Sequence, residues 1–211
     1  AMRLIAVLAL GGGILAGGVP ADAAGTSDAE KPASLSDPVV EATGDRAAGR
    51  ILAGQCRTCH GLDGMAQIPI APHIGGEPVD YIIHQLTAFR DGTREHEMMS
   101  IVARSLSDQQ IRDRAAWYSG HSVPVAPPAD PAAAPEACLA CHGTDGLAQI
   151  PDAPNLAGET NIYIDTQLKA FRSGKRVHDI MTPIAQGMND TDIRAVADWY
   201  SAIKIRIDLA E

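Results

Sequence analysis

The chain carries one five-residue pattern twice, as Cys56-Arg57-Thr58-Cys59-His60 and again as Cys138-Leu139-Ala140-Cys141-His142. Two cysteines separated by two residues, with a histidine directly after the second, form the attachment signature of a c-type haem. Each thiol adds to one haem vinyl group, and the histidine is brought to one face of the iron. We therefore predict two covalently bound haem c groups, attached at Cys56, Cys59, Cys138 and Cys141, with His60 and His142 as iron ligands.

Two other kinds of site also use paired cysteines. A structural zinc ion takes four cysteine or histidine ligands, and a thioredoxin-like pair is a redox centre. Zinc does not require the histidine that ends each motif, and no strand-rich pattern precedes either motif, so haem attachment is favoured. The two motifs use all four cysteines of the chain, which leaves no thiol for a disulfide.

The two motifs belong to a longer internal repeat. The offset that carries Cys56 to Cys138 also carries Pro72 to Pro154, Phe89 to Phe171 and Trp117 to Trp199, without any insertion. Such self-similarity indicates a tandem duplication. We predict one domain over residues 44–119, a Pro/Ala-rich, semi-rigid linker over 120–137 that forms no core, and a second domain over 138–211.

The N-terminal residues have the composition of an export signal. Residues 1–24 contain a positive start at Arg3, an apolar run and small residues around a cleavage point, as in a cleaved signal peptide. An uncleaved membrane anchor is the alternative, but the five glycines of the run weaken a spanning helix. Residues 25–43 read as a flexible lead-in.

The composition indicates how the cores are completed and which class of partner is disfavoured. Aromatic residues make up only 4% of the 211 residues, which is low for two small independent cores, so a large apolar cofactor is expected to complete each one. The formal net charge of −9 argues against nucleic acid as a partner.

The periodicity of apolar residues predicts several helices. A helix is expected to begin at Gly44 and Asp45, with Asp45 as its N-cap, and to run into the first haem motif. A second helix has its apolar face over residues 81–89 and stops at Gly92. Ser107 and Gln110 form a capping box that opens a closing helix.

The repeat also identifies a second axial ligand for each iron. Met65, Met98 and Met188 are replaced by Leu or Ile in the other copy, as expected of interchangeable apolar residues. Met99 and Met181 match each other, so we predict that they are the axial ligands opposite the histidines. His96 and His178 are also in register and form the alternative ligand pair.

Other matched positions suggest lesser roles. The backbone carbonyls of Pro72 and Pro154 lie twelve residues after the haem histidines and are expected to accept the histidine Nδ1 protons. Four arginines are expected to pair with the haem propionates, namely Arg90 and Arg172, with Arg94 and Arg176. The matched aromatic residues are expected in the core. The three histidines without a histidine counterpart, His73, His84 and His121, are expected to be ordinary exposed residues.

These motifs resemble those of the dihaem cytochromes c4, which are tandem class I cytochrome c domains of the periplasm. The resemblance covers residues 44–205 and also rests on the Phe-Arg-x-Gly segments at Phe89 and Phe171 and the Met-x-x-x-Ala segments at Met99 and Met181. It implies two all-α domains related by pseudo-twofold symmetry, each wrapped around a covalent haem, with no bond-making chemistry.

Three functions follow from the resemblance. The first is a periplasmic carrier of electrons from a quinol-oxidising complex or dehydrogenase to a haem-copper terminal oxidase, with redox proteins as partners and peripheral association with membrane complexes. The second is a cytochrome subunit of a dehydrogenase complex, such as a sulfide-oxidising flavocytochrome. The third, a dihaem peroxidase, needs an open iron position, which the matched ligand pairs argue against. Because the two copies differ in sequence around their ligands, their haem potentials are expected to differ.

Overall fold

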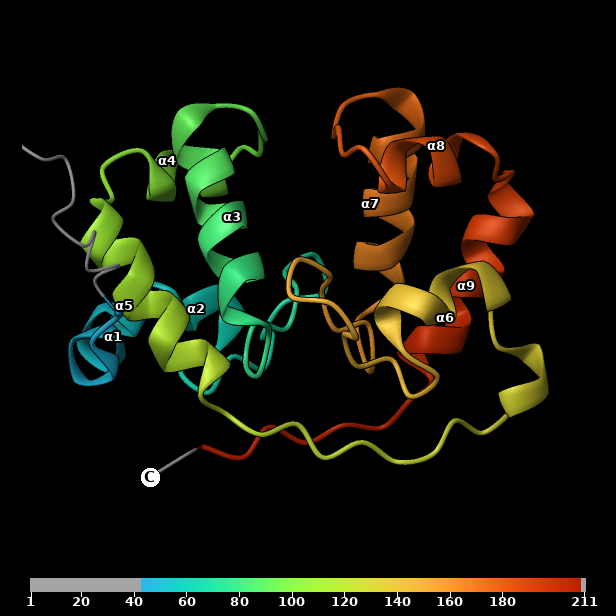
Figure 1. The fold of residues 1–211 in the computed structure, drawn as a ribbon, viewed down its shortest axis with the longest axis horizontal. Coiled ribbons are helices and arrows are strands. Elements are labelled where there is room, and N and C mark those ends of the chain that lie inside the picture. The colour runs from blue at the N-terminus through green and yellow to red at the C-terminus, as the bar shows by residue number, and fades with distance from the viewer. Residues whose placement is uncertain (1–42, 210–211) are drawn as a thin grey trace, which may run out of the picture. The chain divides into compact units, whose positions relative to one another are not determined.

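The computed structural model describes residues 43–209, and these fold into helices joined by loops, without a named strand. The described residues lie in one compact unit, and the helices fall into two groups, here called the first and the second half. The helices of the first half are α1 (Arg46–Leu52), η1 (Ala53–Gln55), α2 (Arg57–His60), α3 (Val79–Asp91), α4 (Met99–Ala103) and α5 (Asp108–Ser119). Those of the second half are η2 (Pro131–Ala133), α6 (Glu136–His142), α7 (Asn161–Ser173), α8 (Met181–Gln186) and α9 (Asp190–Ser201) (Figure 1). The all-α prediction is confirmed.

The predicted signal peptide and nearly all of the predicted lead-in lie outside the described residues. Within residues 43–209, every helix is too short or too polar to span a bilayer.

The predicted helix ends are present. The Asp45 carboxylate accepts the backbone N–H groups of Ala47 and Ala48, which caps α1. Ser107 and Gln110 form the reciprocal capping box of α5. Helix α3 ends at Gly92, whose φ of 78° is the left-handed conformation that glycine adopts without strain.

The two halves have the same helical framework. Helices α7, α8 and α9 begin at the positions that match the starts of α3, α4 and α5 in the other copy, so the repeat in the sequence is a repeat in structure. In the first half α3 packs against α5, and in the second α7 packs against α9. Each pair buries its own apolar cluster, including Ile82 and Trp117 in the first half and Ile164 and Tyr200 in the second.

The halves differ where they begin. In the first half α1 crosses α5 so closely that a methyl group on Gly49 would collide with the carbonyl oxygen of Asp113. The second half has the single turn η2 in the corresponding stretch, and its Asp130 carbonyl accepts the indole N–H of Trp199 at 2.8 Å. The first half therefore has a helix in its core that the second half lacks.

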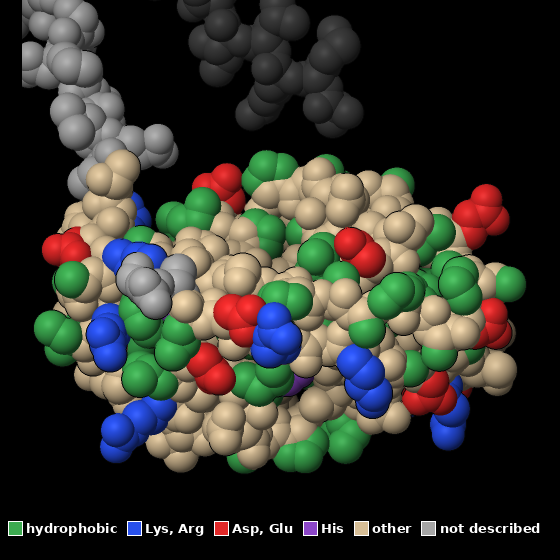
Figure 2. Space-filling model, turned by 90° about the horizontal axis from the view of Figure 1, so that it is seen from below, with side chains coloured by type: hydrophobic (Ala, Val, Ile, Leu, Met, Phe, Trp, Pro, Cys, Tyr) green, Lys and Arg blue, Asp and Glu red, His purple; other side chains and the backbone are tan. Residues whose placement is uncertain are grey.

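The linker is more than a spacer. Its residues 122–126 run antiparallel to the C-terminal residues 204–208, with bridges from Ser122 to Asp208 and from Val125 to Ile205. This two-stranded ribbon passes beneath both halves in Figure 1. Val123 and Ile205 occupy equivalent places in it and pack against Gly76 and Gly158. On the face that Figure 2 shows, basic and acidic side chains are interspersed over the described surface.

The prediction that His121 is exposed was wrong. The imidazole is only 5% exposed and packs edge-on against Trp117, with ring centroids 4.7 Å apart. The counterpart of His121 in the second half is the buried Ile203. The ring also packs edge-on against Tyr118, so two aromatic side chains of α5 lie against His121.

Candidate functional site

A large cavity contains both haem motifs. It has about 2070 Å³ of empty volume, which includes the part open to solvent. The predicted site residues that line it are Cys56, Cys59, His60, Pro72 and Met99 in the first half, and Cys138, Cys141, His142, Pro154 and Met181 in the second. Most of the other lining side chains are aliphatic or aromatic, as a porphyrin face requires.

Both haem-motif histidines are buried and oriented as the spacing predicts. Each ends a short helix, α2 or α6, and its Nδ1 donates a hydrogen bond to a proline carbonyl, at 2.9 Å from His60 to Pro72 and 2.9 Å from His142 to Pro154. A carbonyl only accepts, so Nδ1 carries the proton and Nε2 keeps the lone pair that binds a metal. Burial lowers the pKa of both imidazoles and favours this neutral form.

The cysteines do not fit the alternative sites. Within residues 43–209, no three histidine, cysteine or acidic side chains come together to hold a zinc ion. Burial raises the pKa of the Cys56 and Cys138 thiols, whereas a thioredoxin-like cysteine has a lowered pKa. All four thiols are free and half-buried beside a histidine, which fits attachment to a cofactor in the cavity.

Met99 and Met181 are the first residues of α4 and α8, and both line the cavity. The histidines three residues upstream cap these two helices. Nδ1 of His96 accepts the N–H groups of Met98 and Met99, and Nδ1 of His178 accepts those of Ile180 and Met181. The structure thus gives the alternative ligand pair a role in positioning the methionines.

The structure separates the four predicted arginines into two pairs. Arg90 and Arg172 lie outside the cavity lining, and their guanidinium groups bind the carboxylates of Asp108 and Asp190, each at 2.6 Å. These bonds tie α3 to the start of α5 and α7 to the start of α9. The structure therefore gives no support for a propionate role of Arg90 or Arg172, while Arg94 and Arg176 do line the cavity.

Comparison with known proteins identifies the fold and the cofactor. The family model described as cytochrome c matches residues 132–202. Cytochrome c4 of Pseudomonas aeruginosa is 31% identical over 185 residues, which are 78% of this chain and 92% of that protein. The chain belongs to the cytochrome c4 family.

The thiosulfate dehydrogenase electron acceptor of Thiomonas intermedia is 35% identical, over 71% of this chain and 79% of that protein. The crystal structure of reduced recombinant cytochrome c4 from Pseudomonas stutzeri superposes with a TM-score of 0.68 at 28% identity, over 77% of this chain and 100% of that chain.

Membership of the cytochrome c4 family fixes the general chemistry. The chain is a dihaem c-type cytochrome with two covalently bound haem c groups, and it transfers electrons rather than catalysing a reaction of its own.

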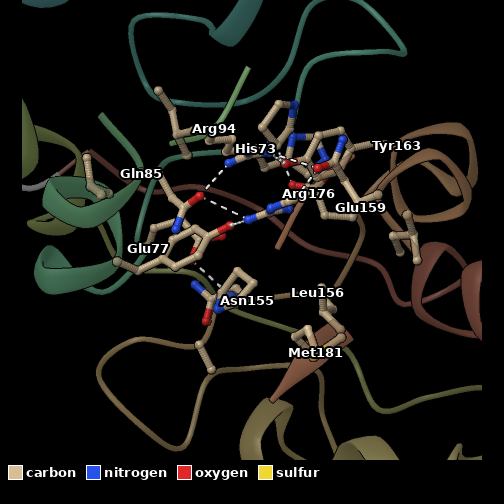
Figure 3. Close-up of a pocket in the computed structure, with 18 of the residues that line it drawn as sticks. His73, Glu77, Gln85, Arg94, Asn155, Leu156, Glu159, Tyr163, Arg176 and Met181 are labelled. Carbon is tan, nitrogen blue, oxygen red and sulfur yellow. Dashed lines mark hydrogen bonds between the residues drawn. The ribbon is translucent and has the colours of Figure 1, made fainter. Parts of the chain in front are cut away.

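A cluster of polar side chains joins the two halves inside the cavity (Figure 3). Arg94 donates to Gln85 of its own half and to Gln167 of the other, and Arg176 donates to the same two amide oxygens. Within residues 43–209, neither guanidinium has an ion pair with a carboxylate. Two cations that share neutral acceptors in an apolar cavity favour an anionic group beside them.

A second cluster joins the halves through buried carboxylates that sequence reasoning missed. The Glu159 carboxylate accepts the backbone N–H of His73 at 2.5 Å, and the Glu77 carboxylate accepts that of Asn155 at 2.9 Å. Only 2% of Glu159 and 4% of Glu77 is exposed. The two glutamates occupy matched positions of the repeat, and this match was the signal in the sequence that could have found them.

His73 was predicted to be exposed, and the structure contradicts this. Nδ1 of His73 accepts the N–H of Ala66, and Nε2 donates to the carbonyl of Gly158 in the other half at 3.0 Å. Its counterpart Asn155 makes the same two bonds with its amide, from Ala148 and to Gly76. The imidazole thus replaces an amide at an interface position, which the difference in residue type concealed. His84, in contrast, is exposed as predicted and pairs with Asp152.

Proposed function

We propose that each half holds its iron between a histidine and a methionine, His60 with Met99 and His142 with Met181. The observation that carries this proposal is that one cavity is lined, in each half, by two free thiols, a histidine with its Nε2 available, and a methionine at a helix start. A bound haem would supply reversible one-electron transfer at its iron.

The chain's own residues would restrict the chemistry to electron transfer. The Pro72 and Pro154 carbonyls hold the imidazoles in one tautomer and orientation. His96 and His178 fix the helix starts that carry Met99 and Met181. If His60 with Met99 and His142 with Met181 hold the two haems, these residues would leave no site for a substrate at the iron, and the haems would supply electron transfer only.

We also propose that Arg94 and Arg176 bind the haem propionates. A guanidinium group matches the geometry of a carboxylate, and both cations lie in the cavity without an acidic partner among the described residues. Each is held over a phenylalanine ring, Phe89 or Phe171, 4.4 Å from the ring centroid, so its position is defined before a ligand binds.

For the cellular role, we propose a periplasmic carrier that takes electrons from a quinol-oxidising complex or a dehydrogenase and delivers them to a terminal oxidase. Its support is the export-type pattern at the start of the sequence and the similarity to cytochromes c4 over most of the chain. A second candidate is a dedicated electron acceptor of a dehydrogenase for sulfur compounds, which the 35% identity to such an acceptor favours.

Mixing experiments with the purified holoprotein test these roles. Reduced holoprotein is added to membranes that contain a haem-copper oxidase, and oxidised holoprotein is added to thiosulfate dehydrogenase with thiosulfate. Rapid oxidation in the first mixture supports the carrier, and reduction in the second supports the dedicated acceptor. A holoprotein that stays inert in both mixtures, while chemical reductants still reduce it, would refute both roles.

A further inference from the structure

A continuous chain of hydrogen bonds links the buried Glu159 to the haem histidine of the other half. The Glu159 carboxylate accepts the N–H of His73, and the carbonyl of Pro72 accepts the Nδ1 proton of His60. That N–H and that carbonyl belong to the same peptide group, the one between Pro72 and His73. The chain of bonds therefore contains a single peptide between the carboxylate and the imidazole.

The repeat makes a second chain of bonds in the opposite direction. The Glu77 carboxylate of the first half accepts the N–H of Asn155, and the carbonyl of the same peptide, at Pro154, accepts the Nδ1 proton of His142. Each half thus contributes the glutamate that acts on the histidine of the other half. The offset between the two glutamates is the same as that between the two histidines.

The surroundings make the effect of these carboxylates strong once they are ionised, which requires a high pH because burial raises the pKa of both groups. Both side chains are almost fully buried, and within residues 43–209 neither forms an ion pair. Oε2 of Glu159 is buried without a hydrogen-bond partner. A carboxylate in a region of low dielectric polarises a hydrogen-bonded chain more than it would in water.

We propose that Glu77 and Glu159 are positioning residues that set the reduction potential of the haem in the opposite half, through the peptide that holds that haem's histidine. This inference rests on the proposed role of His60 and His142 as iron ligands. A carboxylate on the N–H side makes the peptide carbonyl a better acceptor, so the imidazole gains anionic character. A more basic histidine stabilises the oxidised iron, and the potential falls.

Replacing each glutamate by glutamine tests the crosswise pattern. Glu159→Gln keeps an acceptor oxygen but removes the charge, so the first-half haem is expected to become ~3- to 10-fold easier to reduce, up to about 59 mV, with a smaller change in the second. Glu77→Gln is expected to act mainly on the second-half haem, at a pH high enough to ionise Glu77, whose pKa burial also raises. Each potential is followed by NMR of haem methyl signals in partly reduced holoprotein, assigned to a half by their contacts with protein protons. The measurements are made above the pKa of Glu159, which burial raises to about 8, so that this carboxyl is ionised in the wild type.

Two further measurements separate the relay from a general change in structure. In reduced protein the Nδ1 proton signal of His60 is expected to move upfield in Glu159→Gln, because its hydrogen bond weakens, while that of His142 stays in place. His73→Asn is the matched control, because Asn155 already makes both side-chain bonds in the other half. This variant should show neither the shift in potential nor the upfield shift of the Nδ1 signal that is expected for Glu159→Gln.

Several outcomes would overturn the inference. These are potentials that shift in the glutamate's own half, equal shifts in both halves, or unchanged Nδ1 signals in both variants. If wild-type protein lacks the optical band of methionine-ligated haem, the proposed methionine ligation fails, while the crosswise test on the histidines still stands.

The wild type provides the test if a variant does not fold. As the pH rises through the pKa of Glu159, which burial raises to about 8, the His60 Nδ1 signal of reduced protein is expected to move downfield. The other ionisable groups facing this carboxyl are Glu77 and the His73 ring, with Arg94, Arg176, Tyr81 and Tyr163 in the same cavity. A signal that does not change between pH 6 and pH 10 would contradict the relay.

Discussion

Arg114 and Val196 occupy the same position in the two copies of the repeat, and both line the cavity. Arg114 is 2% exposed, and its guanidinium donates to the Gln55 side chain and to the Gln110 carbonyl. A buried cation beside one cofactor, with an aliphatic side chain beside the other, gives the two haems different electrostatic surroundings. A cation favours the reduced iron, so we expect the first-half haem to have the higher potential.

Replacing Arg114 by methionine tests this difference. The variant keeps an apolar stem of similar length but loses the charge, so the first-half potential is expected to fall by roughly 60 mV, a tenfold change for one electron. Redox titration of the holoprotein measures the two steps. Val196→Met is the matched control and should leave the second-half potential nearly unchanged. A first-half potential that is unaffected by Arg114→Met would contradict the assignment of the higher potential.

The carboxyl of Glu159 predicts how stability depends on pH. Burial raises its pKa from the ordinary 4.5 to about 8, so the folded protein binds more protons than the unfolded chain between these values. The contribution of Glu159 to the free energy of unfolding is therefore highest below about pH 4.5. It falls as the pH rises to about 8. Thermal unfolding midpoints of the holoprotein from pH 5 to 8.5 measure this decline, and Glu159→Gln should flatten it. An equally steep decline in the variant would show that another group is responsible.

The close crossing of α1 and α5 predicts a difference between two glycines. An added methyl at Gly49 would meet the Asp113 carbonyl, so Gly49→Ala is expected to destabilise the protein by about 1–3 kcal/mol. Gly54→Ala is the control, because nothing lies within 4 Å of its added methyl group. Chemical denaturation of the holoproteins gives both values. Equal stability of the two variants would contradict the packing of α1.

The His73 contacts predict a graded loss of stability. His73→Ala removes the acceptor of Ala66 and the donor to Gly158, and is expected to cost about 1–3 kcal/mol because buried backbone groups are left unpaired. His73→Asn should recover most of this loss, as Asn155 shows in the other half. The comparison uses thermal unfolding at pH 7, and an Asn variant no more stable than the Ala variant would argue against the equivalence.

Features set by local sequence were predictable. Asp45 and Ser107 cap helices through bonds to residues two or three positions away, and the twelve-residue spacing from His60 to Pro72 is short enough to fix their hydrogen bond. The constant offset between the copies extended each of these local predictions to the second half.

Features that depend on the meeting of the halves were not predictable. Glu159 and His73 are far apart in the chain and meet only where the two halves come together. Arg90 pairs with Asp108 of its own half, whereas Arg94 reaches Gln167 of the other half. The periodicity of apolar residues in the sequence does not show which distant side chains meet in the fold.

The optical spectrum of the oxidised holoprotein, with Met99→His and Met181→His variants, tests the central claim that each half binds its haem between a histidine and a methionine. We predict a sulfur-to-iron charge-transfer band in the near infrared that loses about half its intensity in each single variant and disappears in the double variant, while native reduced protein does not bind carbon monoxide. A spectrum without the band, or ready binding of carbon monoxide by the native protein, would contradict the account.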